Sequence, residues 1–275
     1  MPLVDPVTMS SSISKGAAAK AQSLVKGTTA ATSKDTAILL STHEQQPISL
    51  RQTPLAQSAR HVFPALLATG FLVRFNALVA DPVSTMKTAL AVVVALQLAY
   101  AVICLPVVGS QQGKPARKPR PGEKNLKKGS LGNGVGDGPG ARVYVTAIVA
   151  LLLSTFLTPV LYAAMVLFGA PFLTHGAHTF LCAAHLAALV LFPIFFVHGV
   201  DSASWAAVGS FQAPFDETFG GLVGGVVGAW LGAVPIPLDW DREWQKWPVT
   251  ILCGIYAGHL LMRLLGGTVL FGKRF

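Results

Sequence analysis

A series of long apolar runs places the strongest constraint on what this chain can fold into. The runs are separated by polar or Gly- and Pro-rich stretches, and they cover residues 62–80, 86–108, 143–168, 180–197, 219–234 and 249–271. A helix needs about 20 mainly apolar residues to cross a bilayer, and only the fifth run is clearly short for that purpose. The sequence therefore predicts an all-α integral membrane protein, a bundle of about six transmembrane helices.

The composition agrees with this class. Hydrophobic residues make up 52% of the chain and charged residues only 12%, whereas a soluble domain has about 25% charged residues. The net charge is +9, but the basic runs lack the interleaved aromatic residues of a nucleic-acid platform, so no nucleic-acid partner is expected. The 3 cysteines stand alone inside apolar runs, which favours small buried side chains over disulfides.

The polar segments predict the domain organisation and the topology. Residues 1–60 are rich in Ser, Thr, Ala and Gln, which predicts a disordered tail, and residues 61–275 form the polytopic membrane domain. Residues 109–142 form a basic, flexible loop rich in Gly, Pro and Lys. With six spans, the tail, this loop and the C-terminus fall on one side, which the positive-inside rule assigns to the cytosol. Both termini are therefore predicted to be cytosolic.

The fifth apolar run carries glycines at helical spacing. One row recurs every four residues and a second row runs beside it; the candidate packing residues are Gly220, Gly221, Gly224, Gly225, Gly228 and Gly232. In lipid, small residues at this spacing allow a second helix to approach closely. Two interpretations remain open: the ridge packs against helices of its own chain, or it docks a partner protein or a lipid.

The loop after the glycine helix is the densest polar segment in the apolar part of the chain. Its candidate lumenal surface for headgroups or a partner comprises Pro235, Pro237, Asp239, Trp240, Asp241, Arg242, Trp244 and Trp247. Tryptophan prefers the headgroup level of a membrane, and the prolines prevent a regular helix. The simpler alternative is an interfacial belt whose charges pair with one another. A metal site is disfavoured because no histidine accompanies these carboxylates.

Three histidines near the fourth run would share one helical arc if the helix began early. This spacing of His175, His178 and His185 invites a metal-site hypothesis. No carboxylate stands at a matching offset, however, so interfacial or packed histidines are favoured.

Two arginines lie inside apolar runs, where a charge is costly and is usually paired or functional. We expect Arg263 to reach the cytosolic headgroups, and the candidate partners of the deeper Arg74 are Asp216, Glu217 or a lipid phosphate.

Several catalytic motifs are missing from the sequence. It contains no G-x-S-x-G elbow, no P-loop and no H-E-x-x-H. A lipid enzyme normally displays its acid, base or metal ligands, so we expect a scaffold or binding subunit with no catalytic residues and no cofactor of its own.

Residues 227–250, VGAWLGAVPIPLDWDREWQKWPVT, closely resemble the signature of the PIG-F family, in particular its fungal members. The runs LFGAPFLTH at 167–175 and PFDETFGG at 214–221 are also similar to that family. The resemblance is strong over 167–260, weaker over 62–166, and covers neither the tail nor the basic loop.

The resemblance implies a multi-pass protein of the endoplasmic reticulum that acts in glycosylphosphatidylinositol (GPI) anchor biosynthesis. Such a protein would stabilise a large subunit that transfers phosphoethanolamine from phosphatidylethanolamine to a mannose of the GPI precursor. The metal-dependent catalytic domain would belong to that large subunit. Two alternatives remain: a lipid scramblase or transporter, and a phosphoethanolamine transferase in its own right.

Overall fold

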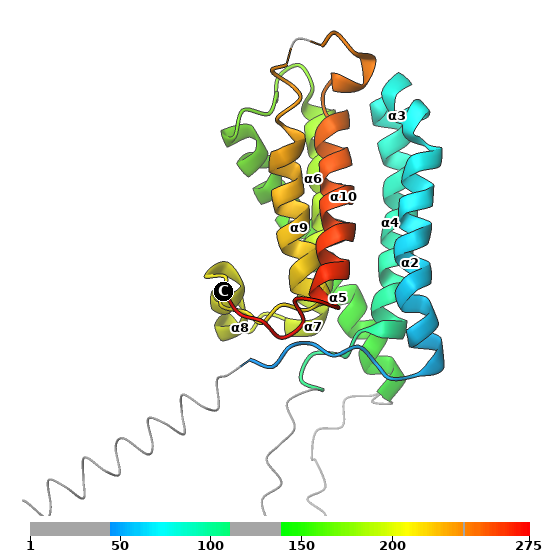
Figure 1. Cartoon of the computed structure of the whole chain (residues 1–275), viewed down its shortest axis with the longest axis vertical. Coiled ribbons are helices and arrows are strands. Elements are labelled where there is room, and N and C mark those ends of the chain that lie inside the picture. Colours follow the sequence, from blue (N-terminus) through cyan, green and yellow to red (C-terminus); the bar gives the residue numbers. More distant parts are fainter. Residues whose placement is uncertain (1–44, 111–138, 239) are drawn as a thin grey trace, which may run out of the picture. The chain divides into compact units, whose positions relative to one another are not determined.

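The computed structural model describes residues 45–110, 139–238 and 240–275. Residues 46–275 form one compact unit, to which the following description applies. Its elements in chain order are α2 (Pro54–Val73), α3 (Phe75–Ala80), α4 (Pro82–Cys104), α5 (Pro139–Leu167), α6 (Gly176–Leu186), η1 (Ala187–Leu191), α7 (Phe192–His198), α8 (Ser202–Gly209), α9 (Glu217–Gly232), η2 (Glu243–Gln245) and α10 (Val249–Gly266). All regular structure among the described residues is thus helical (Figure 1), which confirms the predicted fold class.

Among the described residues, 4 helices are long and apolar enough to cross a membrane. They are Pro82–Cys104, Gly140–Leu167, Gly176–His198 and Val249–Gly266. The glycine helix α9 falls outside this set because it has only 16 residues. The helix α2 has 20 residues, but Gln57, Ser58 and Arg60 reduce the hydropathy of its first half. A count of six spans therefore stays a prediction.

Side-chain caps and prolines set where the helices begin. Thr53 accepts a hydrogen bond from the Ala56 amide at the start of α2, and Asp81 does the same for Ser84 at the start of α4. In both helices a proline follows the cap, where its missing N–H costs nothing. The helix α2 therefore includes residues 54–60, which the composition placed in the tail. Residues 45–53 of the predicted tail are described as well: the Ile48 amide donates to Asp216, and the Arg51 amide donates to the Cys104 carbonyl. Residues 1–44 of that tail and residues 111–138 of the basic loop lie outside the described residues.

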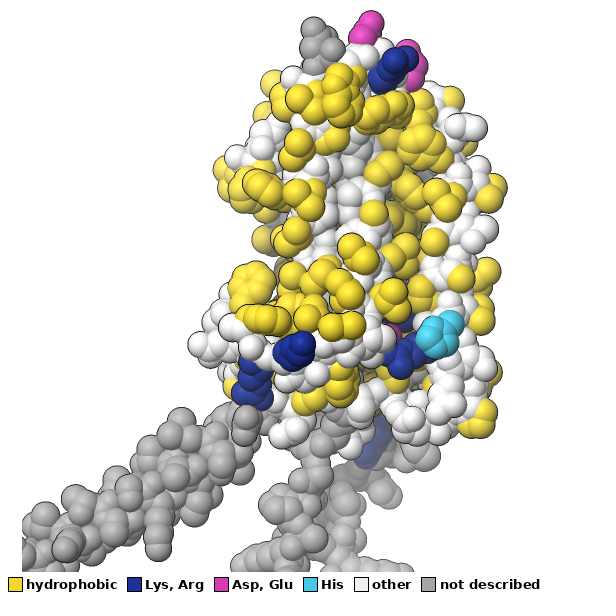
Figure 2. Space-filling model, viewed as in Figure 1, with side chains coloured by type: hydrophobic (Ala, Val, Ile, Leu, Met, Phe, Trp, Pro, Cys, Tyr) yellow, Lys and Arg dark blue, Asp and Glu magenta, His cyan; other side chains and the backbone are white. Residues whose placement is uncertain are grey.

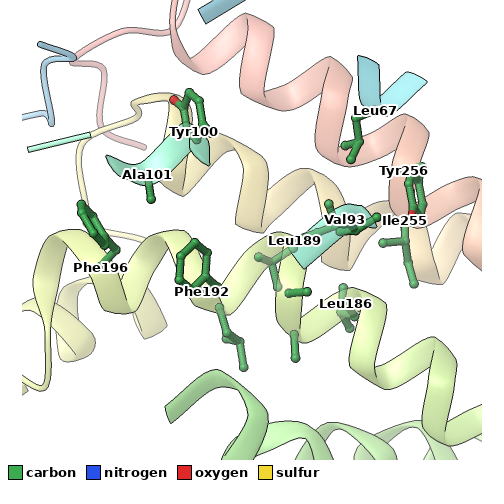
Figure 3. Close-up of a cluster of buried hydrophobic side chains, with 14 of the residues drawn as sticks. Leu67, Val93, Tyr100, Ala101, Leu186, Leu189, Phe192, Phe196, Ile255 and Tyr256 are labelled. Carbon is green, nitrogen blue, oxygen red and sulfur yellow. The ribbon is translucent and has the colours of Figure 1, made fainter. Parts of the chain in front are cut away.

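The rod formed by α6, η1 and α7 lies at the centre of the bundle. In its most apolar window 89% of the residues are buried, against 28% for α4 and for α5. A helix that is apolar all round is expected to be buried in this way. Figure 3 shows Leu189, Phe192 and Phe196 of this rod beside side chains of α2, α4 and α10. The core of the protein is therefore packed around this rod.

A proline explains the widened π-turn in the middle of this rod. In a regular α-helix the carbonyl oxygen of Leu189 would accept a hydrogen bond from residue 193, but Pro193 has no N–H to donate. The Gln97 side chain of α4 donates to that carbonyl instead, at 3.3 Å. A buried carbonyl that loses its helical partner is in this way satisfied from a neighbouring helix.

The surface of the bundle matches a membrane environment. Figure 2 shows apolar side chains over the middle of the visible face and charged side chains toward its two ends. On α5, Ile148, Leu152 and Phe156 are each more than half exposed. An apolar surface of this kind is unfavourable in water, whereas it is what the hydrocarbon core of a bilayer requires.

Candidate functional site

The first row of glycines on α9 lies directly against the backbone of α10. A β-carbon on Gly228 would lie 3.1 Å from the α-carbon of Gly258 and would collide with the carbonyl oxygen of Gly254. A β-carbon on Gly232 would lie 2.5 Å from the carbonyl oxygen of Thr250. A β-carbon on Gly220 would collide with the carbonyl oxygen of Met262, and one on Gly224 would collide with that of Gly258. The two helices therefore touch along their backbones.

The matching surface on α10 consists of its own small residues. A β-carbon on Gly254 or Gly258 would collide with the carbonyl oxygen of Gly228 or Gly224, respectively, and one on Gly266 would collide with that of Asp216. The four-residue spacing of Gly254 and Gly258 is the sequence signal for this row on α10, which the sequence analysis did not use. We call the paired helices α9 and α10, with their two glycine rows, the glycine hairpin.

The second glycine row of α9, which contains Gly221 and Gly225, also packs against residues of its own chain. A β-carbon on Gly221 would lie 2.9 Å from Cε1 of His259, whose Nδ1–H donates to the Gly221 carbonyl at 3.1 Å. Gly225 faces Val190 of η1 just as closely. Of the two interpretations of the ridge, the structure thus favours packing within the chain. The glycine face is filled and has no room for a helix of another protein.

A buried ion cluster ties the start of α9 to three other helices. Glu217 forms ion pairs with Arg60 of α2 and, at 3.4 Å, with Arg263 of α10, and it accepts a hydrogen bond from the Tyr100 hydroxyl of α4 at 2.9 Å. The Arg263 guanidinium lies over the Tyr100 ring, 3.9 Å from its centroid. Arg60 also donates to the Gly267 carbonyl at 2.7 Å. Arg263 is therefore not directed at headgroups, as the sequence led us to expect, but is buried beside a carboxylate.

Arg74 lies elsewhere and meets neither of its predicted acidic partners. It caps α2 where the chain bends into α3, and its Nη1 donates to Thr88 Oγ1 of α4 at 2.8 Å. The side chain is exposed on the surface of the bundle. Glu217 instead pairs with Arg60 and Arg263, and Asp216 caps α9 by accepting from the amides of Thr218 and Phe219. A lipid phosphate is the remaining candidate partner.

The loop between α9 and α10 is organised by Gln245, a residue that the sequence did not single out. Its Nε2 donates to the carbonyl oxygens of Pro235 and Leu238 at 2.9 and 2.6 Å, and its Oε1 accepts from the Arg242 amide at 3.0 Å. One side chain thus bonds to three backbone groups of the loop, and the two carbonyl oxygens also accept from the amides of Leu238 and Trp240. Pro237 lies within the turn that these bonds close, and Asp239 is outside the described residues.

The tryptophans of this loop differ in burial: Trp244 and Trp247 are half-buried, and Trp240 is exposed. Trp247 donates from its indole to Thr179 Oγ1 of α6 at 3.1 Å, which fixes the end of the loop to the central rod. Trp240 and Trp244 contact each other with ring centroids 5.8 Å apart, and Trp240 is 53% exposed. Asp241 and Arg242 are also exposed, and Glu243 pairs with Lys246 at 3.0 Å. We call residues 233–248 the tryptophan loop.

The three histidines do not assemble into a site. His175 and His178 contact each other with ring centroids 5.0 Å apart. His185 is fully buried in α6, where its Nδ1–H donates to the Leu181 carbonyl at 2.9 Å. Within the described part of the chain no group of three His, Cys, Asp or Glu side chains could hold a metal ion. His185 is thus a packed histidine, whereas His175 is exposed and His178 is half-buried.

Comparison with known proteins bears on what this arrangement serves. The family model described as "GPI biosynthesis protein family Pig-F" matches residues 62–267. A Neurospora crassa protein named glycosylphosphatidylinositol anchor biosynthesis protein 11 is 61% identical over 281 residues, which cover 100% of both chains. The protein of the same name from Pyricularia oryzae is 46% identical over 98% of this chain and 96% of its own length.

A more distant relative carries a more specific name. The mouse protein named "GPI ethanolamine phosphate transferase, stabilizing subunit" is 34% identical over 123 residues, which cover 41% of this chain and 52% of the mouse protein. No solved structure matches the chain. Because the family model covers most of the chain and the fungal relatives match it over nearly its whole length, the chain belongs to the Pig-F family of GPI biosynthesis proteins.

Proposed function

We propose that this chain is the accessory membrane subunit of a GPI ethanolamine phosphate transferase. It stabilises a catalytic partner subunit, which transfers phosphoethanolamine from phosphatidylethanolamine to a mannose of the GPI precursor. The observation that carries this proposal is the family membership, together with the name of the mouse relative as a stabilizing subunit. The lack of a metal-ligand cluster among the described residues is compatible with this role but does not itself argue for it.

The surface offered to the partner follows from what the glycine hairpin leaves exposed. Its glycine rows are filled, while Val227, Trp230 and Leu231 on the outer face of α9 are each about half exposed or more. This face leads directly into the tryptophan loop, where Trp240 is also exposed. We assign this continuous apolar and aromatic surface to the membrane helices of the transferase subunit. The hairpin then holds the surface rigid instead of docking the partner with its glycines.

The proposed location is the endoplasmic reticulum membrane, with both termini in the cytosol and the tryptophan loop in the lumen. The hydrogen bond between Arg60 and Gly267 places the start of α2 and the end of α10 on one side of the bundle. The tryptophan loop and the bend at Arg74 lie at the other end (Figure 1). This arrangement needs an even number of crossings, as a six-span topology has, and the basic loop supports a cytosolic side for the termini.

The decisive experiment is the profile of labelled GPI precursors in cells depleted of this protein. We expect a mannosylated precursor that lacks phosphoethanolamine on an outer mannose to accumulate, and wild-type protein to restore the normal profile. A normal profile after depletion would reject the proposal. Lipid flipping by the purified chain in liposomes would then support a scramblase, and phosphoethanolamine transfer by the chain alone would identify an enzyme.

The role of the tryptophan loop is tested by neutralising its acidic residues. Replacing Asp239 and Asp241 together with asparagine should reduce phosphoethanolamine transfer more than it reduces co-purification of the transferase subunit. Glu243→Gln in the same loop is the matched control. If transfer is unchanged, the loop is only an interfacial belt.

A further inference from the structure

A groove separates α2 from α4 and α10 in the half of the bundle that contains the bend at Arg74. Its cavity has a volume of about 90 Å³. The lining is contributed by α2, α3, α4 and α10 and is almost entirely apolar; it includes Leu67, Gly70, Phe71, Ala89, Val93 and Tyr256. Figure 3 shows Leu67, Val93 and Tyr256 converging from α2, α4 and α10.

The groove opens toward the outside of the bundle. Leu66 and Val92, which also line it, are about half exposed. A β-carbon on Gly70 would have no atom within 4 Å, so this glycine leaves space where any other residue would fill it. Water is a poor occupant because a buried water molecule needs two to four polar partners, and only Arg74, Thr85 and Tyr256 bring polar side-chain atoms to the lining. An apolar chain from the surrounding membrane fits the lining better.

The polar end of the groove is formed by Arg74 and Thr85. Arg74 lies four residues beyond Gly70, one turn along α2. The guanidinium has five N–H donors, of which one is used by Thr88. The described residues provide no acidic partner for Arg74. An arginine on an apolar helix is costly unless it is paired, and a guanidinium can bind a phosphate diester through two parallel hydrogen bonds.

The geometry points to a phospholipid-binding site: part of one acyl chain lies in the groove between α2, α4 and α10, and the lipid phosphate binds Arg74. From Leu67 to Arg74 the helix rises about 10 Å, so the site joins an apolar compartment to a cationic one within the reach of one lipid molecule. The cavity holds only part of one chain, and the remainder of the lipid stays in the bilayer. This site is separate from the glycine hairpin and does not depend on the proposed function.

The site is tested with the full-length protein in nanodiscs that contain a phosphatidylethanolamine with a photoreactive diazirine in one acyl chain. After illumination, mass spectrometry locates the labelled residues. We expect labels on residues 66–96, and a fall of about fivefold or more at these residues in Gly70→Leu, which fills the groove. Gly209→Leu is the matched control, because a β-carbon at this glycine of α8 also has no atom within 4 Å. Equal labelling of Gly70→Leu and the control would overturn the proposal.

The role of the phosphate is tested by Arg74→Gln, with Lys87→Gln as the control. Lys87 is an exposed cation of α4 that does not line the groove. Unlabelled phosphatidylethanolamine should displace the probe from the wild type several times better than diacylglycerol of the same chains, and Arg74→Gln alone should lose this preference. Equal competition in the wild type would refute phosphate binding at Arg74.

One further competition experiment distinguishes a whole lipid from its headgroup, and a second variant replaces Gly70→Leu if that variant does not fold. Free glycerophosphoethanolamine should not displace the probe; displacement would mean a phosphate site without an acyl chain and would overturn the proposal. If Gly70→Leu is not recovered as folded protein, Ala89→Leu fills the groove from the opposite wall, and unchanged labelling in that variant would count against the site in the same way.

Discussion

The glycine hairpin and the α2–α4 pair show two opposite ways of packing apolar helices. In the hairpin, glycines face glycines, and the backbones of α9 and α10 touch because no side chain separates them. Between α2, α4 and α10 larger side chains such as Phe71 and Tyr256 meet, and a cavity remains beside Gly70. Helices in lipid gain most from close van der Waals packing. The hairpin is therefore the most closely packed contact between two helices, whereas the groove leaves space for a ligand.

The largest effect is expected where the hairpin is broken. Gly228→Leu would drive a side chain into the backbone of Gly254 and Gly258, and such overpacking should cost about 3 kcal/mol or more. We expect loss of the monodisperse folded protein in size-exclusion chromatography, at wild-type levels of membrane insertion. Gly254→Leu should have the same effect from the other helix. Recovery of Gly228→Leu as stable protein that fails only to bind its partner would show that the ridge faces that partner after all.

A second large effect is expected at the ion cluster that anchors the hairpin to α2 and α4. Glu217→Gln keeps the shape of the side chain but leaves Arg263 buried without its counter-charge, and loss of one partner of a buried pair costs about 3 kcal/mol. The thermal stability of the purified protein should fall accordingly. Glu243→Gln, which breaks an exposed pair with Lys246, should change it little. Similar stability of both variants would mean that water reaches the Glu217 cluster.

A smaller effect on stability is expected in the tryptophan loop, which connects the two helices of the hairpin. Gln245→Ala removes the three hydrogen bonds that close the loop, each of which contributes about 1 kcal/mol. Limited proteolysis between residues 233 and 248 should become faster, while the helices stay intact. Gln212→Ala, at an exposed glutamine outside the bundle core, is the control. If both variants resist proteolysis equally, contacts other than those of Gln245 hold the loop.

The smallest effect on stability is expected at Gly70, where a side chain has space, in contrast to Gly228, where it has none. Leucine at this position enters open space and replaces a poor helix former, a change of about 1 kcal/mol in favour of the helix. The thermal stability of Gly70→Leu should therefore stay the same or rise slightly, even as lipid labelling falls. A loss of stability comparable with that of Gly228→Leu would show that the two glycines are not as different as the structure indicates.

The sequence by itself determined the class of the protein and its family. Long apolar runs can only be helices in a membrane, because every backbone group there must be paired within the segment. Local signals also set several helix starts, as the caps Thr53, Asp81 and Asp216 show. The signature at residues 227–250 led to the Pig-F family, which the comparisons confirm.

Only the tertiary structure decided what each special residue contacts. The spacing of Gly228 and its neighbours indicated a close helix–helix contact, but the identity of the second helix depends on which segment the fold brings beside it. For the same reason the sequence did not reveal the partner of Arg263, because Glu217 lies 46 residues away. Nor did it reveal the role of Gln245, whose three hydrogen bonds exist only once the loop is closed. Periodicity describes one helix at a time, whereas the partner of a face is a property of the whole bundle.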